Sequence, residues 1–237
     1  TDPAKYYENN VGGGIALLAA CRECGVRKLI FSSTAAVYGE PREVPIPEEH
    51  PLEPTSVYGR TKLAFERMLA DYAAAYPFEY IALRYFNAAG ADPDGKLGED
   101  HDPETHLIPL VLDAALGRRE AITVFGTDYP TQDGTCVRDY VHVSDLAQAH
   151  VLALERLAAG GGSGVFNLGN GQGFTVRQVI EAAERVVGRP IPVREGPRRP
   201  GDPAVLVASS ERAKIDLGWR PVLTSLEAIV ATAWAWR

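Results

Sequence analysis

Short apolar runs alternate with longer helical segments along almost the whole chain. Four runs are expected to be strands, namely Lys28–Phe31, Glu79–Arg84, Ile122–Val124 and Val165–Leu168. Helical periodicity is expected over Ala4–Cys24, Ser56–Ala75, His106–Leu116, Ser144–Leu157, Thr175–Val187, Ser210–Leu217 and Ser225–Trp236. Strands that alternate with helices favour an α/β fold with a parallel, doubly wound sheet, because parallel strands need a crossover that a helix can supply.

The bulk composition is that of a globular protein. Its 237 residues suffice for one large domain or two small ones, each with a sizeable core. The net charge of −7 and the absence of a long basic run argue against a nucleic-acid surface. No apolar stretch approaches the roughly 20 residues of a membrane-spanning helix, and no signal peptide is visible. We therefore expect a cytoplasmic protein.

The three cysteines and five histidines show neither a disulfide framework nor a familiar metal-binding spacing. Cys21 and Cys24 form a C-x-x-C pair, but they close a predicted helix, whereas a redox pair opens one, where the helix dipole lowers the thiol pKa. No second pair or histidine cluster offers further ligands for zinc. We interpret both cysteines as buried helix residues and expect no metal.

The segment Tyr58-Gly59-Arg60-Thr61-Lys62 gives the strongest indication of chemistry. Residues four apart share one face of a helix, with their side chains about 5–6 Å apart. A phenol with a pKa near 10 is a poor base at neutral pH, but a neighbouring ammonium group favours the phenolate and lowers that pKa. The pair could then move a proton from a hydroxyl group that is being oxidised. Two surface residues are the alternative interpretation of this spacing alone.

The flanking segments favour the catalytic interpretation. Ser32-Ser33-Thr34 follows the strand predicted at Lys28–Phe31, so its hydroxyl groups would lie at the end of that strand. After a proline-rich loop, Thr55-Ser56 can cap the helix that carries Tyr58 and Lys62. A hydroxyl group from the strand could therefore hydrogen-bond the phenol.

Further segments match one family closely. They are Ser32–Gly39 (SSTAAVYG), Arg84–Ala91 (RYFNAAGA), Phe125–Val143 (FGTDYPTQDGTCVRDYVHV), most specific from Tyr129 onward, and Arg198–Asp202 (RRPGD). With Thr34, Tyr58 and Lys62, they resemble the extended branch of the short-chain dehydrogenase/reductase family, which comprises NAD-dependent epimerases and dehydratases of nucleotide sugars. The resemblance covers the whole chain. It implies a Rossmann-like cofactor domain with a smaller substrate domain.

The resemblance also implies an activity, namely the interconversion of UDP-galactose and UDP-glucose through a transient 4-keto sugar and bound NAD. It assigns catalysis to Thr34, Tyr58 and Lys62, and cofactor contacts to Asn9, Thr34, Tyr58, Lys62 and Phe86. It assigns contacts with the nucleotide sugar to Thr34, Asn87, Leu107, Phe125, Arg138, Arg199, Asp202 and Leu206. The guanidinium groups would hold the diphosphate, and Phe125 would lie beside the uracil. A homodimer is the expected assembly.

Some of these assignments have structural alternatives, and two positions depart from the family pattern. Phe86 could be a core residue, and both arginines could be solvated surface residues. His106 stands where the family often has asparagine, so this contact would depend on the backbone or on Leu107. Leu206 stands where a tyrosine often walls the sugar pocket, which leaves the range of substrates open.

The start of the chain and its glycines bear on the cofactor. The chain opens inside a predicted helix, and its only methionine is Met68, so we expect residues upstream of Thr1. The resemblance places the phosphate-binding glycines and the ribose-binding acid there. Gly169–Gly173 has the spacing G-x-G-x-G, one residue short of a dinucleotide-binding loop, and the resemblance places it in the substrate domain.

The expected domains follow from the same resemblance. Residues 1–87 would be the downstream part of the dinucleotide-binding domain. Residues 88–237 would be mainly the nucleotide-sugar domain, with the chain recrossing around 139–170.

Two other functions remain open. The first is a nucleotide-sugar dehydratase or decarboxylase with the same fold and cofactor. Dehydratases of this branch have an Asp-Glu pair directly after the threonine to eliminate water, and Ala35-Ala36 stands there instead. A fragment without catalytic activity, which binds nucleotide sugar weakly or not at all, would follow from a missing upstream unit. Retention of NAD by the purified protein separates this fragment from an active epimerase.

Overall fold

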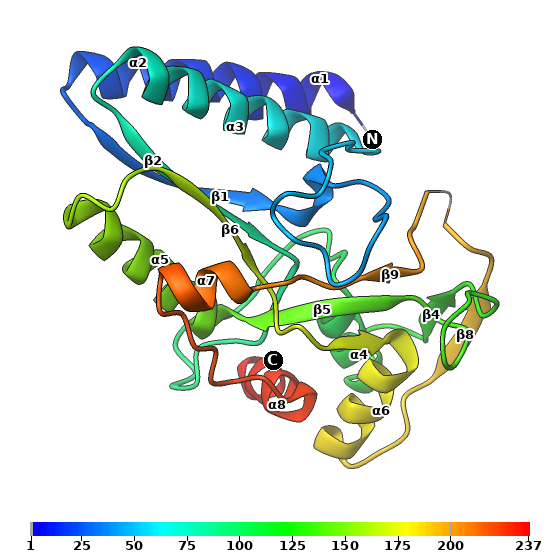
Figure 1. The fold of residues 1–237 in the computed structure, drawn as a ribbon. Helices are drawn as coiled ribbons and strands as arrows, with labels where there is room; N and C mark the ends of the chain where they lie inside the picture. Colours follow the sequence, from blue (N-terminus) through cyan, green and yellow to red (C-terminus); the bar gives the residue numbers. More distant parts are fainter. Residues whose placement is uncertain (1, 200) are drawn as a thin grey trace. The chain divides into compact units, whose positions relative to one another are not determined.

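The computed structural model describes residues 2–199 and 201–237, which form two compact units (Figure 1). Pro200 of the RRPGD motif and Thr1 lie outside the described residues. Unit 1 contains the chain up to Phe86 together with Gln148–Leu168 and Ala208–Trp219. Unit 2 contains the remaining segments, Asn87–Ala147, Gly169–Val207 and Arg220–Arg237. The chain therefore passes repeatedly from one unit to the other.

Unit 1 is built on a three-stranded parallel sheet. Its strands are β1 (Lys28–Thr34), β2 (Glu79–Tyr85) and β6 (Gly164–Leu168), in the order β1-β2-β6. The side chains of the central strand β2 are fully buried from Ile81 to Leu83, as its continuous apolar sequence predicts. The α/β class with parallel pairing is thus confirmed.

Helices cover this sheet on both faces. The segments α1 (Pro3–Tyr6), η1 (Tyr7–Gly12) and α2 (Gly13–Glu23) run beside α3 (Val57–Ala75), whereas α5 (Val143–Ala158) and α7 (Glu211–Asp216) lie on the other side (Figure 1). The single helix predicted at the start is therefore interrupted, because η1 is a π-helix. Such irregular turns occur frequently at functional sites, and this one carries Asn9.

The packing of α2 on α3 explains one glycine and one cysteine. Leu18 and Cys21 of α2 share a buried cluster with Phe65, Leu69 and Phe78. A Cβ atom on Gly14 would lie 2.5 Å from the Phe65 ring, so only glycine allows this approach. Cys21 is thus a core residue, as predicted. The prediction is wrong for Cys24, which is exposed because it is the C-cap residue of α2.

A buried ion pair lies between α3 and β2. The guanidinium group of Arg84 donates from Nε to both carboxylate oxygens of Glu66, at 3.0 and 3.2 Å. Arg84 also donates to the Tyr38 hydroxyl at 3.0 Å, which in turn donates to Asn167 at 2.6 Å. Only 4% of Arg84 and 5% of Glu66 are exposed. The charges of Arg84 and Glu66 are therefore compensated by each other and not by water.

Unit 2 contains short strands that the sequence does not predict. Strand β5 (Val137–His142) pairs in parallel with β3 (Asn87–Ala89) and β9 (Val205–Leu206), and antiparallel with β7 (Gly173–Thr175). The predicted strand β4 (Ile122–Phe125) pairs in parallel with β8 (Val193–Gly196). Strands β3, β7 and β9 have only two or three residues, which carry no measurable periodicity, so their pairings arise from tertiary contacts.

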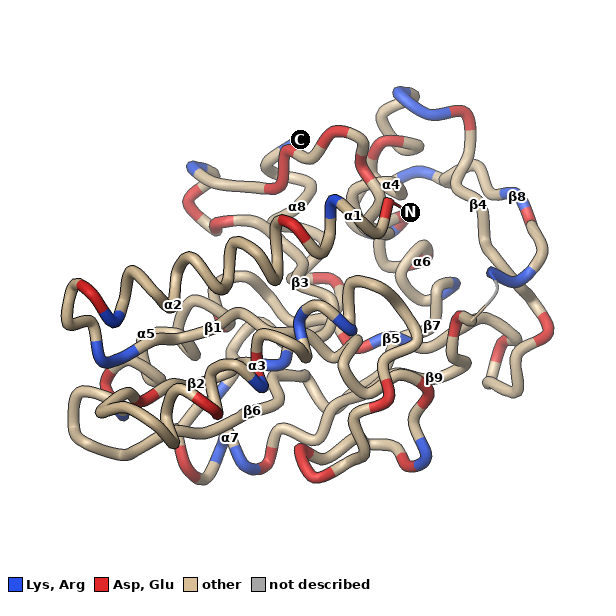
Figure 2. Tube along the Cα trace, turned by 90° about the horizontal axis from the view of Figure 1, so that it is seen from above, with Lys and Arg blue, Asp and Glu red and all other residues tan. Residues whose placement is uncertain are grey.

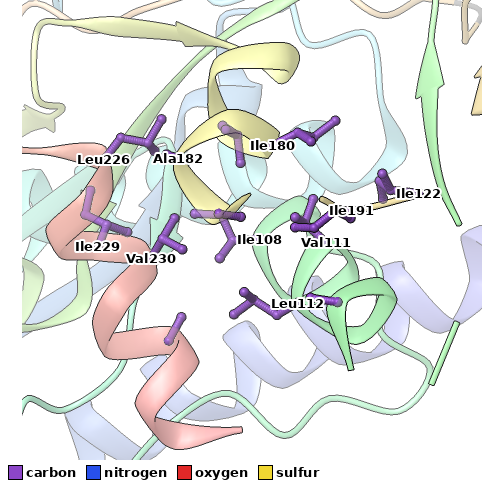
Figure 3. Packing of buried hydrophobic residues seen from close by; sticks show 14 of the residues in the cluster. Ile108, Val111, Leu112, Ile122, Ile180, Ala182, Ile191, Leu226, Ile229 and Val230 are labelled. Atoms are coloured by element: carbon purple, nitrogen blue, oxygen red, sulfur yellow. The ribbon is translucent and has the colours of Figure 1, made fainter. Parts of the chain in front are cut away.

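Three helices form the core of unit 2. They are α4 (Leu107–Ala115), α6 (Val176–Val187) and α8 (Leu226–Trp236). Figure 3 shows Ile108, Val111 and Leu112 of α4 facing the apolar side chains of α6 and α8. This cluster fixes the position of the start of α4, where His106 is the N-cap residue.

Residues of both charges are mixed along the chain. Along the trace in Figure 2, Lys and Arg positions are interspersed with Asp and Glu positions. Among the helices described in residues 2–199 and 201–237, none is both long and apolar enough to cross a bilayer.

Candidate active site

Thr34, Tyr58 and Lys62 come together in unit 1, where β1 ends and α3 begins. Thr34 ends β1, and its hydroxyl oxygen accepts a hydrogen bond from Ala36 N at 3.1 Å. A second side-chain hydrogen bond joins Thr34 to Tyr58. Lys62, one turn further along α3, lies with Nζ 5.8 Å from the Tyr58 ring centroid. The structure therefore brings together the three residues that the sequence proposes as catalytic.

Gly59 makes this approach possible. A Cβ atom at this position would lie 2.3 Å from the carbonyl oxygen of Ala36, so a larger residue would push α3 away from the end of β1. Ser56 caps α3 by accepting from Gly59 N at 3.0 Å, which sets the first turn of the helix. Both features hold Tyr58 next to Thr34.

The acid–base properties differ from the expectation. Burial raises the pKa of Tyr58 above its ordinary value, and the hydrogen bond with Thr34 opposes this only in part. Burial also lowers the pKa of Lys62. The predicted lowering of the Tyr58 pKa by Lys62 is thus wrong for this arrangement, because the ammonium group donates instead to Ser32 O at 2.9 Å. In this geometry the phenol is protonated at neutral pH.

A cavity of about 370 Å³ in unit 1 adjoins the same lysine. Asn9 and Lys62 line it together with apolar residues of β1 and α2, among them Leu29 and Phe31. Asn10, next in η1, donates from Nδ2 to the Thr61 hydroxyl at 2.9 Å and so fastens η1 to α3. An ammonium and an amide group beside an apolar wall fit the nicotinamide-ribose part of a dinucleotide. Phe86 is half-buried directly after β2.

A larger cavity, of about 570 Å³, lies within unit 2. Six of the proposed substrate residues line it, namely Asn87, Leu107, Phe125, Arg138, Arg199 and Asp202. Three arginines, Arg119, Arg138 and Arg199, line it together with two acidic residues, Glu104 and Asp202. A cavity with excess positive charge and one aromatic wall suits a nucleoside diphosphate.

Strand pairing positions the polar groups of this cavity. Arg138 of β5 donates from Nη1 to Val137 O at 2.7 Å and forms an ion pair with Asp202. Asn87 of β3 donates from Nδ2 to Asp139 O at 2.8 Å. Both side chains are therefore hydrogen-bonded to backbone carbonyl groups of β5, which limits their movement.

Arg199 is held differently. Its guanidinium carbon lies 4.1 Å from the Phe125 ring centroid, a cation–π contact. The preceding Arg198 stacks on Tyr129 at 4.2 Å and donates to Asp128 Oδ1 at 2.7 Å. In this geometry Arg199 covers a face of the ring that we expect beside the uracil.

Leu206 is not among the residues that line this cavity. It pairs with Arg138 in the β5–β9 ladder, so the two side chains point to the same face of the sheet. His106 lines the cavity as the N-cap residue of α4, without a capping hydrogen bond from its side chain. Leu107 follows as the first helical residue, so its backbone amide is available at the start of a helix.

The glycine-rich loop at Gly169–Gly173 serves a structural purpose. Asn170 N and Gly171 N donate to the two oxygens of the buried Asp139 carboxylate, at 2.7 and 3.3 Å. An internal anion thus occupies the amide groups that a phosphate would need.

Sequence reasoning missed some residues at these sites. Arg119, Thr123 and Tyr140 line the cavity of unit 2. It also missed a group formed by Glu99, His101, Glu104 and His106, whose ligand atoms all lie within 4.8 Å of one another. The pattern E-x-H-x-x-E-x-H over Glu99–His106 is the sequence signal that could have indicated this group.

An α/β nucleotide-binding fold with a Thr–Tyr–Lys site defines the class of this protein. The chain belongs to the NAD dependent epimerase/dehydratase family, whose model matches residues 1–169. It is 58% identical over 234 residues to UDP-glucose 4-epimerase of Halalkalibacterium halodurans, covering 99% of this chain and 70% of that protein. The resemblance inferred from the motifs is thereby confirmed.

Two solved structures are similar over nearly the whole chain. One is UDP-glucose 4-epimerase from Brucella ovis in complex with NAD, with 53% identity, a TM-score of 0.96, and coverage of 98% of this chain and 72% of that one. The other is the Bifidobacterium longum enzyme in complex with NAD⁺ and UDP, with 42% identity, a TM-score of 0.92, and coverage of 99% and 70%.

Proposed function

We propose that this chain is a UDP-glucose 4-epimerase that interconverts UDP-galactose and UDP-glucose with bound NAD. The observation that carries the proposal is the hydrogen-bonded Thr34–Tyr58 pair with Lys62 one turn along the helix. Relatives that are 53–58% identical over nearly the whole chain catalyse this reaction, as their names state. The enzyme acts in galactose metabolism as an isomerase.

The residues of unit 1 supply the proton chemistry. NAD, held by Asn9 and Lys62 at the unit 1 cavity, would supply the acceptor and donor for the hydride of sugar carbon 4. Tyr58 removes the proton from the 4-hydroxyl group and gives it back, and Thr34 orients the phenol and the sugar hydroxyl. Lys62 favours the phenolate once its Nζ leaves Ser32 O for the ribose and the phenol. Asn9 and Phe86 complete the cofactor contacts.

The residues of unit 2 hold the nucleotide. Arg138 and Arg199 bind the diphosphate through charge-assisted hydrogen bonds, and Asp202 accepts hydrogen bonds from hydroxyl groups. Phe125 packs against the uracil, and Asn87 and Leu107 contribute polar groups beside it. Immobilising the nucleotide leaves the sugar as the part that reacts.

The residues that follow Thr34 disfavour elimination of water. Ala35 and Ala36 follow Thr34, so no carboxyl group stands where a dehydratase would need an acid. We therefore favour epimerisation over dehydration on the same fold. We further propose a cytoplasmic location and a homodimeric assembly. Light scattering on the intact protein would test the assembly.

The activity can be tested directly on the intact native protein. UDP-galactose is supplied without added reductant, and formation of UDP-glucose is followed with a coupled UDP-glucose dehydrogenase. Steady formation of UDP-glucose is expected. A 4-keto-6-deoxy product would instead indicate a dehydratase, and no product would indicate a protein without catalytic activity.

Arg199→Ala is expected to weaken the binding of UDP. Charged hydrogen bonds contribute about 1.5–3 kcal/mol, so the dissociation constant measured by calorimetry should rise about tenfold or more. Arg194→Ala is the matched control, because Arg194 is an exposed arginine of β8 that pairs with Glu120. Equal affinity of Arg199→Ala and the control would show that Arg199 does not hold the diphosphate.

Leu206→Tyr is expected to narrow the range of sugars. Leucine leaves more room than tyrosine beside the substituent at carbon 2, so we expect activity on UDP-N-acetylglucosamine as well as on UDP-glucose. Overpacking costs about 1–3 kcal/mol, so the added ring should reduce the specificity constant for the N-acetylated sugar about fivefold or more relative to UDP-glucose. If the ratio of the two specificity constants were unchanged in Leu206→Tyr, Leu206 would not be the residue that controls access of the N-acetylated sugar.

A further inference from the structure

The loop that precedes α4 gathers two imidazole and two carboxylate groups. Glu104 Oε1 lies 3.6 Å from His106 Nδ1 and 3.9 Å from His101 Nδ1. Glu99 Oε1 contacts the same His106 nitrogen. The two rings stack with their centroids 5.7 Å apart and their planes 24° apart. Four potential ligand atoms, two nitrogens and two oxygens, thus all lie within 4.8 Å of one another.

Contacts from outside the loop hold these groups in place. Trp236 of α8 donates from Nε1 to Glu99 O at 3.2 Å. A Cβ atom on Gly98 would lie 2.2 Å from the Trp236 ring, so the loop packs closely on α8. The Glu104 side chain is only 9% exposed, and its second oxygen pairs with Arg237 at 3.3 Å. A carboxylate held by an outer partner is typical of ligands that are oriented before a metal binds.

We propose that Glu99, His101, Glu104 and His106 form a binding site for Zn²⁺. Two imidazole nitrogens and two carboxylate oxygens are ligands that zinc takes in tetrahedral sites, with bonds of about 2.0–2.2 Å. Such bonds place neighbouring ligand atoms about 3.4 Å apart. The observed separations, up to 4.8 Å, therefore require only small side-chain rotations.

The position of the site gives the metal a structural role. Glu104 and His106 also line the cavity of unit 2, and His106 is the N-cap residue of α4. Zinc would join the loop before α4 to the N-cap residue of that helix and so fix one wall of the cavity. It would not contact Tyr58 or take part in the proton transfer, so the proposal does not depend on the proposed function.

The test is zinc binding by the intact native protein after treatment with a chelator. Titration with Zn²⁺ against a chromophoric chelator should show one saturable site per chain. His101→Ala and His106→Ala should each weaken this site by at least about tenfold, since even outer-shell changes cost 10–100-fold. Anomalous diffraction at the zinc edge should place the ion between the four side chains. Zinc should also raise the melting temperature of the native protein but not that of a variant that combines His101→Ala with His106→Ala.

Asp100→Asn is the matched control, because it removes a charge from the same exposed segment without removing a proposed ligand. It should bind zinc like the native protein. Absence of a saturable site would overturn the proposal and leave the cluster as a hydrogen-bonded network. Equal affinity in the histidine variants, or an equal loss in Asp100→Asn, would also overturn it, because binding would then reflect general attraction to acidic surface. Circular dichroism verifies that each variant is folded.

Discussion

Replacing Tyr58 with phenylalanine should reduce the turnover number for UDP-galactose by at least about 10²-fold, the usual contribution of a general acid or base. The ring would still pack near Tyr6, whose centroid lies 6.1 Å away. Only the hydroxyl group that hydrogen-bonds Thr34 would be lost. The turnover number is measured by coupled assay at saturating substrate, so that weaker binding does not contribute.

Tyr72→Phe provides the control for this variant. Tyr72 lies on the same helix and packs edge-on against Tyr76 and Phe78. Removing its hydroxyl group should leave the turnover number unchanged. If Tyr58→Phe and Tyr72→Phe were equally active, the assignment of Tyr58 as the acid–base residue would be wrong.

Replacing Arg84 with methionine should lower the free energy of unfolding by about 3–5 kcal/mol, because breaking a buried ion pair leaves an uncompensated charge. Glu66 would keep the bond from the Ser33 hydroxyl group but lose both bonds from Arg84 Nε. Urea denaturation of the intact protein measures this change. The double variant Arg84→Met, Glu66→Leu should recover much of the loss, since apolar replacement of a whole buried pair is often neutral.

An exposed pair of the same type supplies the comparison. Arg42 donates to Glu53 at 2.7 Å, but their side chains are 62% and 64% exposed. Arg42→Met should therefore change the free energy of unfolding by only about 0–1 kcal/mol. Similar small losses in Arg42→Met and Arg84→Met would show that burial does not strengthen the dependence of Glu66 on Arg84.

The catalytic group was predictable because its signals are local. The strand that ends at Thr34 has an apolar sequence, and the helix that carries Tyr58 and Lys62 has a capping residue and a fixed spacing. These features determine which side chains share a face before any tertiary contact forms. The direction of the Tyr58 pKa was not predictable, because it depends on how deeply neighbouring elements bury the phenol and on where Lys62 points.

The lining of the unit 2 cavity was predictable only where motifs exist. Arg138 and Asp202 come from long matching segments, whereas Arg119 and Tyr140 carry no pattern that marks them as lining residues. Strands such as β7 and β9 are too short to show a period of two. The Glu99–His106 group assembles because α8 packs on the loop, a contact between segments that are more than a hundred residues apart.

The central claim is that the hydride leaves carbon 4 and returns to the same carbon while Tyr58 moves the proton. UDP-glucose deuterated at carbon 4 should be incubated with the intact native protein in ordinary water, and the products analysed by NMR spectroscopy and mass spectrometry. We expect UDP-galactose that retains deuterium at carbon 4. UDP-galactose that has exchanged this deuterium for solvent hydrogen, or the absence of UDP-galactose, would contradict the claim.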